Sequence, residues 1–156
     1  MMVEPNSCRF CRVSAENGFD IVYEDALFLG FTDRNPASAH HFQVIPKAHI
    51  ASVRSLNPAS HVGLVQAMEA VGRRILDNFG VPESMRKMGF HIPPMNSVYH
   101  LHLHVQGLPY HSTTRALKYP VVRGFGHFSK GPSWFVEVHQ AMRILEHGGH
   151  IGLLPC

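Results

Sequence analysis

The sequence is poor in cysteine, and it has no long apolar run. Three cysteines in 156 residues are an odd number, and two of them form a C-x-x-C pair at residues 8–11. This usage argues against a secreted disulfide framework and predicts reduced thiols. No stretch reaches the length of a membrane-spanning helix, and the first residues lack a basic segment before an apolar run. We therefore expect a soluble intracellular protein with no membrane partner.

Composition and charge are those of an ordinary globular chain. Charged residues make up 16% of the sequence and apolar residues 45%, and the formal net charge is +3. A chain of this length can bury a sizeable core, so we expect a single domain over residues 1–156. The basic residues are scattered, which suits a small anionic ligand and neither requires nor excludes nucleic acid.

Histidine is abundant, with 13 copies, and three of them alternate with aliphatic residues in HLHLHV at residues 100–105. Successive side chains of a strand point to opposite faces, so His100, His102 and His104 would share one face. Two prolines before this stretch and Gly107 after it bound a predicted strand over residues 97–107. Three imidazoles are costly to bury without partners, so a purely structural role explains them poorly.

Short β-prone runs that end at turn residues predict four further strands, over residues 21–23, 26–31, 41–45 and 86–91. In the third of these, His41 and Gln43 share a polar face, while apolar residues share the other. The last run is expected to pair with the histidine strand, which brings His91 near the start of that strand.

Two helices are predicted from apolar residues at a helical period. The first is expected to begin with Asn57 as N-cap and Pro58 at the first helical position, and to end at Gly80. The second is expected over residues 134–145. Residues 107–132 are rich in glycine, proline and serine and are expected to be an irregular loop.

Two smaller features leave alternatives open. A single C-x-x-C pair is compatible with a redox motif, half of a metal site or two unrelated thiols, and we favour the metal because no strand precedes the pair. Asp33 follows an aromatic strand, where a carboxylate can hold a sugar hydroxyl. Its neighbours Asn35 and Pro36 are also typical of turns, and the residues alone favour the turn.

Several motifs together resemble the histidine triad (HIT) superfamily. The run HLHLHVQ at residues 100–106 is similar to its signature, in which histidines alternate with apolar residues. Other similar segments, in chain order, are CRFC at residues 8–11, FTD at 31–33, HFQVIPKAHI at 41–50 and SVY at 97–99. The segments MGFHIPP at 88–94 and WF at 134–135 resemble the third Hint branch, which is related to aprataxin. The resemblance spans about residues 8–147 and leaves 148–156 as a tail.

The resemblance implies an α+β domain with a five-stranded antiparallel sheet and two main helices, commonly paired as a homodimer in the cytoplasm or nucleus. It also implies hydrolysis of adenylated substrates, such as AMP-amides and acyl-adenylates, through a nucleotidyl-histidine intermediate. His102 would attack the α-phosphorus, His104 would donate to the phosphoryl oxygens and His41 would support both. Ser97 would contact the leaving group. A neutral imidazole whose second nitrogen is held by an acceptor suits this chemistry at neutral pH.

The same resemblance implies a nucleotide pocket and a metal. Asp33 would bind the ribose of an AMP-type purine nucleotide, and Phe10 and Phe31 would line the base pocket. A structural zinc ion would be held by Cys8, Cys11, His49 and His100, a tetrahedral set of two thiolates and two imidazoles. His100 would then serve the structure rather than the reaction. No organic cofactor is expected.

The sequence departs from the family pattern at three places. Gln106 stands where the family prefers an apolar residue, and we expect it at the mouth of the site. Arg34 stands where Hint proteins usually carry an aliphatic residue near the base. Residues 110–130 have no counterpart that aligns, which leaves leaving-group specificity the least determined part of the interpretation.

Three rival functions are considered. Aprataxin-like removal of AMP from DNA ends is disfavoured because no cysteine lies between Cys11 and Cys156, which leaves no C-terminal finger, and no basic patch is evident. A second is a non-catalytic protein that binds purine nucleotides as a scaffold. A third is a zinc enzyme with His100, His102 and His104 as ligands, which is strained because alternate side chains of a strand stand nearly parallel.

Overall fold

Six antiparallel strands form one sheet in the computed structural model, which describes residues 7–156. In chain order the strands are β1 (Ile21–Glu24), β2 (Phe28–Thr32), β3 (Ser38–Pro46), β4 (Arg86–His91), β5 (Leu103–Tyr110) and β6 (Phe135–Glu137). Their spatial order is β1-β2-β3-β5-β4-β6. The helices are α1 (Val62–Asn78), α2 (Thr113–Ala116) and α3 (Val138–Glu146), with short 3-10 helices η2 (Arg9–Arg12), η3 (Val53–Ser55) and η4 (Glu83–Met85). The predicted α+β class is confirmed, with one strand more than expected.

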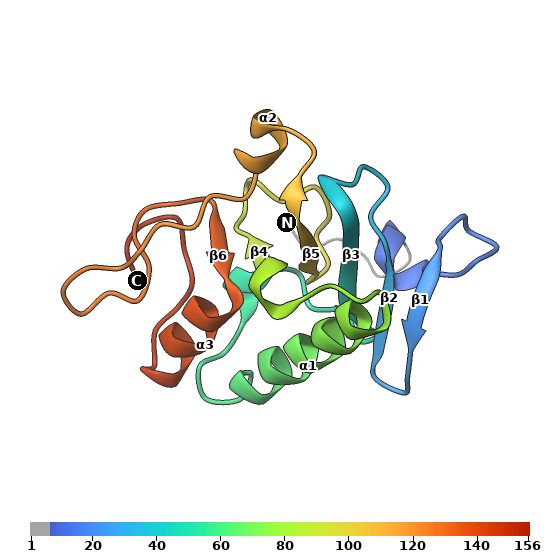
Figure 1. Cartoon of the computed structure of the whole chain (residues 1–156). Coiled ribbons are helices and arrows are strands. Elements are labelled where there is room, and N and C mark those ends of the chain that lie inside the picture. The colour runs from blue at the N-terminus through green and yellow to red at the C-terminus, as the bar shows by residue number, and fades with distance from the viewer. Residues whose placement is uncertain (1–6) are drawn as a thin grey trace.

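The two faces of the sheet carry different residues. Val44 of β3 lies opposite Leu103 of β5, and both are fully buried in the main apolar core with residues of α1 and α3. Figure 1 shows these two helices together on one side of the strands. Burying such a side chain contributes about 1.5–3 kcal/mol. In the same pair of strands, Gln43 lies opposite His104, and both point to the other face. None of the helices in the described part of the chain has the length and apolar character needed to cross a membrane.

The first predicted helix begins later than expected. Asn57 does not cap α1, because its side-chain oxygen accepts a hydrogen bond from the Ala59 N–H at 2.8 Å and closes a turn. The N-cap of α1 is His61, whose ring accepts from the Asn57 N–H instead. The predicted end of the helix is confirmed, since Gly80 follows it with a φ of +68°, a conformation that glycine adopts without strain.

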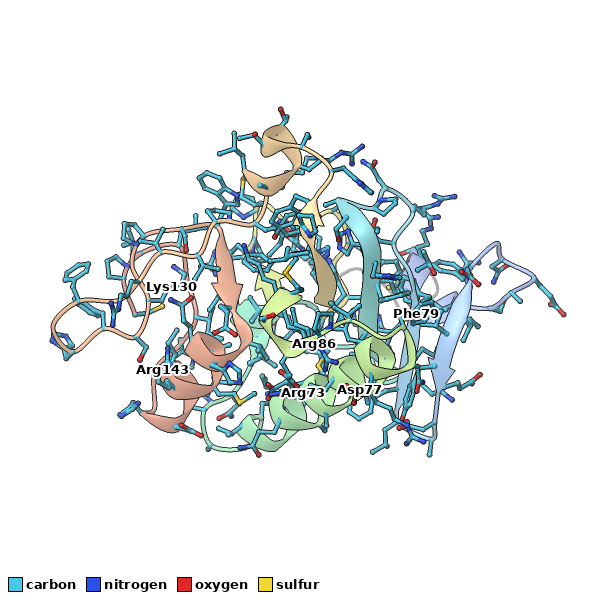
Figure 2. The ribbon with its side chains drawn as sticks, viewed as in Figure 1. Arg73, Asp77, Phe79, Arg86, Lys130 and Arg143 are labelled. Atoms are coloured by element: carbon cyan, nitrogen blue, oxygen red, sulfur yellow. The ribbon has the colours of Figure 1, made fainter. Side chains whose placement is uncertain are left out.

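Arg86 joins the end of α1 to β4. Its guanidinium donates to Asp77 of α1 at 2.6 Å and to the Val81 carbonyl at 2.9 Å. Figure 2 shows Arg73, Asp77 and Arg86 gathered along α1. Since β4 carries His91 at its other end, this contact helps to fix the strand that reaches the polar face.

The second predicted helix begins later than expected, because its first residues form a strand. Phe135, Val136 and Glu137 extend the sheet as β6, with Phe135 opposite His91 of β4. The helix begins only after Glu137, whose carboxylate accepts from the N–H groups of His139 and Gln140 in a capping box. The apolar spacing from residue 134 onward suggested one long helix. For residues 135–137, pairing with the free edge of β4 determines the structure in place of the helical spacing.

The predicted histidine strand is also displaced. β5 begins at Leu103 and continues past Gly107 to Tyr110, so only His104 of the three histidines belongs to it. His100 and His102 precede the strand, and the His102 Nδ1–H donates to the His100 carbonyl at 2.7 Å. The three rings therefore do not form one row. Residues 111–132 are mostly irregular, as expected, with α2 as a short helix inside them.

Candidate active site and metal centre

A cavity of about 480 Å³ opens on the polar face of the sheet. Part of its wall is aromatic, with the rings of Phe10, Phe19 and Phe31 at centroid distances of 5.0 to 6.2 Å. Asp33 and Gln43 lie beside them, and the Gln43 amide donates to the Asp33 carboxylate at 2.6 Å. The amide oxygen of Gln43 is buried and has no partner among residues 7–156. This end of the cavity combines ring surfaces with acceptors for hydroxyl groups.

Asp33 forms the predicted turn, and its carboxylate also lines the cavity. One carboxylate oxygen accepts from the Asn35 N–H at 2.8 Å, which is the predicted turn. The other oxygen bonds Gln43 and lies 3.4 Å from His41 Nε2. The turn therefore holds a carboxylate that lines the cavity.

His41, His104 and His91 form a hydrogen-bonded series that we call the histidine chain. The Ala37 N–H donates to His41 Nδ1 at 2.9 Å, which places the proton of a neutral His41 on Nε2. His41 Nε2 lies 3.0 Å from His104 Nδ1, and His104 Nε2 lies 3.1 Å from His91 Nδ1. At the far end the His91 Nε2–H donates to the Lys118 carbonyl at 2.8 Å. A backbone N–H at one end and a backbone carbonyl at the other thus determine which nitrogen carries the proton in each ring of the histidine chain.

Burial keeps the histidine chain neutral. It lowers the pKa of His41 to about 4, although the charge of Asp33 opposes the shift. Burial also lowers the pKa of His104 far below its ordinary value and lowers the pKa of His91. The contacts of Asp33 with His41 and His104 are therefore polar contacts rather than ion pairs at neutral pH.

His102 is separate from the histidine chain. Its Nδ1–H is held by the His100 carbonyl, so the lone pair is on Nε2. The ring is 6% exposed and packs against Phe10 and His104, with centroid distances of 5.5 and 5.2 Å. Burial lowers its pKa to about 4. His104 and the exposed Ser97 line the 480 Å³ cavity, whereas His102 lies just behind its wall.

Cys8, Cys11, His49 and His100 converge in what we call the cysteine–histidine cluster. The Nδ1 atoms of His49 and His100 are 3.3 Å apart, and sulfur–Nδ1 distances are 3.2 to 3.5 Å. Zinc bonds of about 2.05 Å to nitrogen and 2.3 Å to sulfur would give tetrahedral edges of about 3.3 and 3.6 Å. The His100 Nε2–H donates to the Pro46 carbonyl at 2.8 Å, which leaves the Nδ1 lone pair for the cluster. The donor set fits a tetrahedral zinc ion.

Two other metal arrangements do not fit. Asp33, His41 and His104 lie close together, but the proton on His41 Nε2 occupies the position that a metal would need. The rival set of His100, His102 and His104 does not fit, because the three rings have separate partners. His100 faces the cysteines, and His102 donates to a carbonyl. His104 lies between two other histidines.

Comparison with known proteins decides the family. Residues 7–119 match the family described as scavenger mRNA decapping enzyme C-term binding. Adenosine 5'-monophosphoramidase HINT3 of Mus musculus is 41% identical over 150 residues, which cover 90% of this chain and 82% of that protein. The chain belongs to the histidine triad (HIT) superfamily, and it is of the Hint type.

Further relatives of this HIT protein agree in fold. The bifunctional adenosine 5'-phosphosulfate phosphorylase/adenylylsulfatase HINT4 of Arabidopsis thaliana is 37% identical over 124 residues, or 78% of this chain and 84% of that protein. A solved histidine triad protein from Clostridium difficile superposes with a TM-score of 0.59 at 28% identity and covers 70% of this chain and all of that chain.

Two departures of this HIT protein from the family pattern are now placed. Gln106 is not at the mouth of the site, which corrects the expectation. It is fully buried behind His41, and it accepts a hydrogen bond from the Tyr110 hydroxyl at 2.8 Å. Arg34 lines the cavity, and its guanidinium has no ion pair or hydrogen bond among the described residues.

The segment that could not be aligned contributes to the site of this HIT protein. The Lys118 carbonyl ends the histidine chain, and the buried Tyr119 ring lies 5.6, 5.0 and 5.3 Å from the rings of His41, His91 and His104. Sequence reasoning placed His91 near the triad but gave it no role. The available signal was the strand register, because Gly89 lies opposite His104 and so carries His91 to the cavity.

Proposed function

We propose that this HIT protein is a hydrolase of adenylated substrates, of the adenosine 5'-monophosphoramidase type. The observation that carries the proposal is a neutral His102 whose Nδ1–H is held by a carbonyl, next to His104 and a cavity with an aromatic and hydroxyl-binding end. The names of HINT3 and HINT4, which are relatives over most of the chain, favour the same chemistry on AMP derivatives.

The substrate's nucleoside is assigned to the aromatic end of the cavity. Phe10, Phe19 and Phe31 provide ring faces for a purine. Asp33 accepts from the ribose hydroxyls, and the partnerless Gln43 oxygen beside it offers a further acceptor. This placement brings the α-phosphoryl group to His104 and Ser97.

In the first step, His102 Nε2 forms a bond to the α-phosphorus and the bond from phosphorus to the leaving nitrogen breaks. The departing amine takes a proton from solvent water. His104 redirects its Nε2–H from His91 to the phosphoryl oxygens, where charge develops. The carbonyl of His100 holds the Nδ1 proton and stabilises the positive charge that the ring gains. The wall around His102 must open slightly to let Nε2 reach the phosphorus, because the ring lies just behind the cavity.

In the second step, water attacks phosphorus and the bond from phosphorus to His102 breaks. The attacking water loses a proton to solvent, which balances the proton that the amine took in the first step. The net reaction therefore consumes one water and yields amine and AMP. The low pKa of His102 keeps the free ring unprotonated and ready for another cycle.

We assign a structural zinc ion to the cysteine–histidine cluster. When bound, it links residues from the start of the chain, the end of β3 and the approach to β5. Because His100 is also the acceptor for His102, zinc would position the proposed nucleophile through the main chain without joining the reaction. A homodimer and a cytoplasmic or nuclear location remain proposals from the resemblance, and sedimentation of the purified protein tests the dimer.

Hydrolysis of an adenosine 5'-phosphoramidate with a fluorescent amine tests the proposal. The unchanged protein should release amine and AMP in equal amounts, and His102→Ala should lose at least about a thousandfold in kcat while still binding AMP. AMP binding without any turnover would instead support the nucleotide-binding scaffold. A fall of affinity for adenylated nicked DNA with rising salt, together with AMP release from it, would support the aprataxin-like function.

A further inference from the structure

Positive charge gathers at the nucleoside end of the cavity. Arg9 and Arg34 line this end, and Asp33 is the only acidic residue that lines the cavity in the described part of the chain. After Asp33, the sequence has no further acidic residue before Glu69. The carboxylate of Asp33 is therefore the one group on the cavity wall that could neutralise the two arginines.

The Asp33 carboxylate does not pair with Arg34, the next residue. Its two oxygens accept from the Asn35 N–H at 2.8 Å and from the Gln43 amide at 2.6 Å. Within residues 7–156, the Arg34 guanidinium has no hydrogen bond or ion pair. A guanidinium has five N–H donors in a planar fork, so an unpaired one on a cavity wall suits an anionic ligand with several oxygens, such as a phosphate.

The main chain that carries Arg34 is held on both sides. Before it, the Asp33 N–H donates to the His41 carbonyl at 2.8 Å. After it, the Arg115 guanidinium donates to the side-chain oxygen of Asn35 at 2.5 Å and to its carbonyl at 3.3 Å. A ligand that binds Arg34 therefore has to order one side chain and not the loop, which reduces the entropy lost on binding.

Arg9 provides the second cation, from a different element. It belongs to η2, whereas Arg34 follows β2. The Arg9 guanidinium lies over the Phe19 ring, with 5.5 Å between the guanidinium carbon and the ring centroid. It has no hydrogen bond or ion pair among the described residues. Two separate elements thus bring guanidinium groups without a counter-ion to the same end of the cavity.

The placement of the nucleotide decides which anion these cations meet. In the proposed function the base lies on the aromatic rings, Asp33 accepts from the ribose, and the 5'-phosphoryl group lies at His104. An anion beside Arg34 is then carried by the ribose itself, at its 2' or 3' position. Dinucleotide-binding proteins use the same pair of groups, an acidic residue for a ribose hydroxyl and a nearby arginine for a phosphate on that ribose.

We propose that Arg34, supported by Arg9, forms a subsite for a phosphate group on the ribose, so that the substrates are adenylates that carry a 2'- or 3'-phosphate. This inference rests on the proposed function, and it narrows the class of nucleotide. Asp33 binds the ribose hydroxyl that remains. The two guanidinium groups offset the repulsion between its carboxylate and the phosphate.

Three substrates with the same fluorescent amine test the subsite. They are the 5'-phosphoramidates of adenosine, of adenosine 3'-phosphate and of adenosine 2'-phosphate. Because the leaving group is constant, the ratio of kcat/KM for a phosphorylated compound to that for the unphosphorylated compound isolates the ribose phosphate. We expect the full-length protein to prefer one phosphorylated compound by at least about tenfold, as for a charge-assisted hydrogen bond near solvent. The preferred compound identifies the position of the phosphate.

Arg34→Met removes the guanidinium and keeps a long side chain, and it should bring this ratio close to one. Lys118→Met is the matched control, because the Lys118 ammonium also lines the cavity without a hydrogen bond or ion pair in the described structure. The control should keep the ratio of the unchanged protein. No preference in the unchanged protein, an unchanged ratio in Arg34→Met, or an equal fall in both variants would overturn the subsite. Turnover of the unphosphorylated compound would still support the proposed function.

A binding measurement decides the subsite even if no amidate is hydrolysed. By calorimetry, adenosine 3',5'-bisphosphate or adenosine 2',5'-bisphosphate should bind about tenfold more tightly than AMP, and Arg34→Met should remove the difference. Equal affinities for the three nucleotides, or a difference that persists in Arg34→Met, would contradict the subsite. Lack of turnover with all three amidates in the unchanged protein would contradict the proposed function separately.

Discussion

The cysteine–histidine cluster and the histidine chain are both built around buried histidines, yet they hold their protons in opposite ways. In the cluster, a main-chain acceptor at Pro46 takes the Nε2–H of His100, so its Nδ1 lone pair faces the two sulfurs. In the histidine chain, the backbone N–H of Ala37 donates to Nδ1 of His41. The proton of His41 is therefore on Nε2 and points toward His104. The cysteine–histidine cluster thus presents a lone pair that can bind a metal ion. In the histidine chain, the N–H of His41 occupies the position that a metal ion would need. The main-chain partner, not the residue type, sets the role of each histidine.

Removing one sulfur of the cysteine–histidine cluster should have the largest effect on stability, and it should leave the histidine chain unchanged. Cys11→Ala should reduce the zinc content of the purified protein from about one ion per chain to near zero. The free energy of unfolding should fall by several kcal/mol, since metal binding contributes to folding. Elemental analysis and urea unfolding measure both quantities. Cys156→Ala is the matched control, because Cys156 lies outside the cluster. Full zinc content and unchanged stability in Cys11→Ala would contradict a zinc site at the cysteine–histidine cluster.

Acid should destabilise the histidine chain by a somewhat smaller amount. The pKa of His41 is about 4 in the folded protein against an ordinary 6.5. Between these values the unfolded chain binds a proton that the folded chain does not, so stability is full above about pH 6.5 and falls as the pH drops toward 4. The loss from this residue is up to about 3 kcal/mol.

Urea unfolding at a series of pH values measures that slope. Asp33 opposes the shift of His41, while His91 and Arg115 add to it, so the comparison needs a variant of His41 alone. His41→Gln should be less stable at neutral pH and should lose part of the acid slope. The same slope with and without His41 would show that this residue does not titrate as described.

Shortening the histidine chain at its far end should have the smallest effect. In His91→Gln, the His104 Nε2–H loses its ring acceptor and the Lys118 carbonyl loses its ring donor. We expect kcat to fall about tenfold with little change in zinc content, which corresponds to about one hydrogen bond. His139→Gln is the control, because that ring is half exposed and bonds Glu69 and Glu137 instead. Equal kcat values for the two variants would show that His91 has no role in turnover.

The sequence was sufficient for features that depend on local pattern. The alternation of polar and apolar residues in β3 and the start of β5 predicted which face is buried, because a one-residue slip would expose the whole apolar set. The end of α1 followed from Gly80. The residues proposed for zinc and for the nucleotide end of the cavity do lie together in the two predicted groups, although their roles remain predictions.

The features that the sequence could not predict depend on pairing between distant segments. β6 forms because β4 has a free edge, and the apolar period of residues 134–145 carries no sign of that edge. The direction of the histidine chain depends on Ala37 and Lys118, whose side chains take no part in it. Main-chain groups that are placed by tertiary structure leave no pattern in the sequence.

We propose that His102 alone among these histidines attacks phosphorus. The direct measurement is mass spectrometry of peptides after the protein is mixed with an AMP amidate and quenched at alkaline pH, where the bond between phosphorus and histidine survives. We expect AMP on the peptide that contains residues 100–104, with fragmentation assigning it to His102 and no adduct in His102→Ala. AMP on His104 or on His91, or rapid turnover without any adduct, would contradict it.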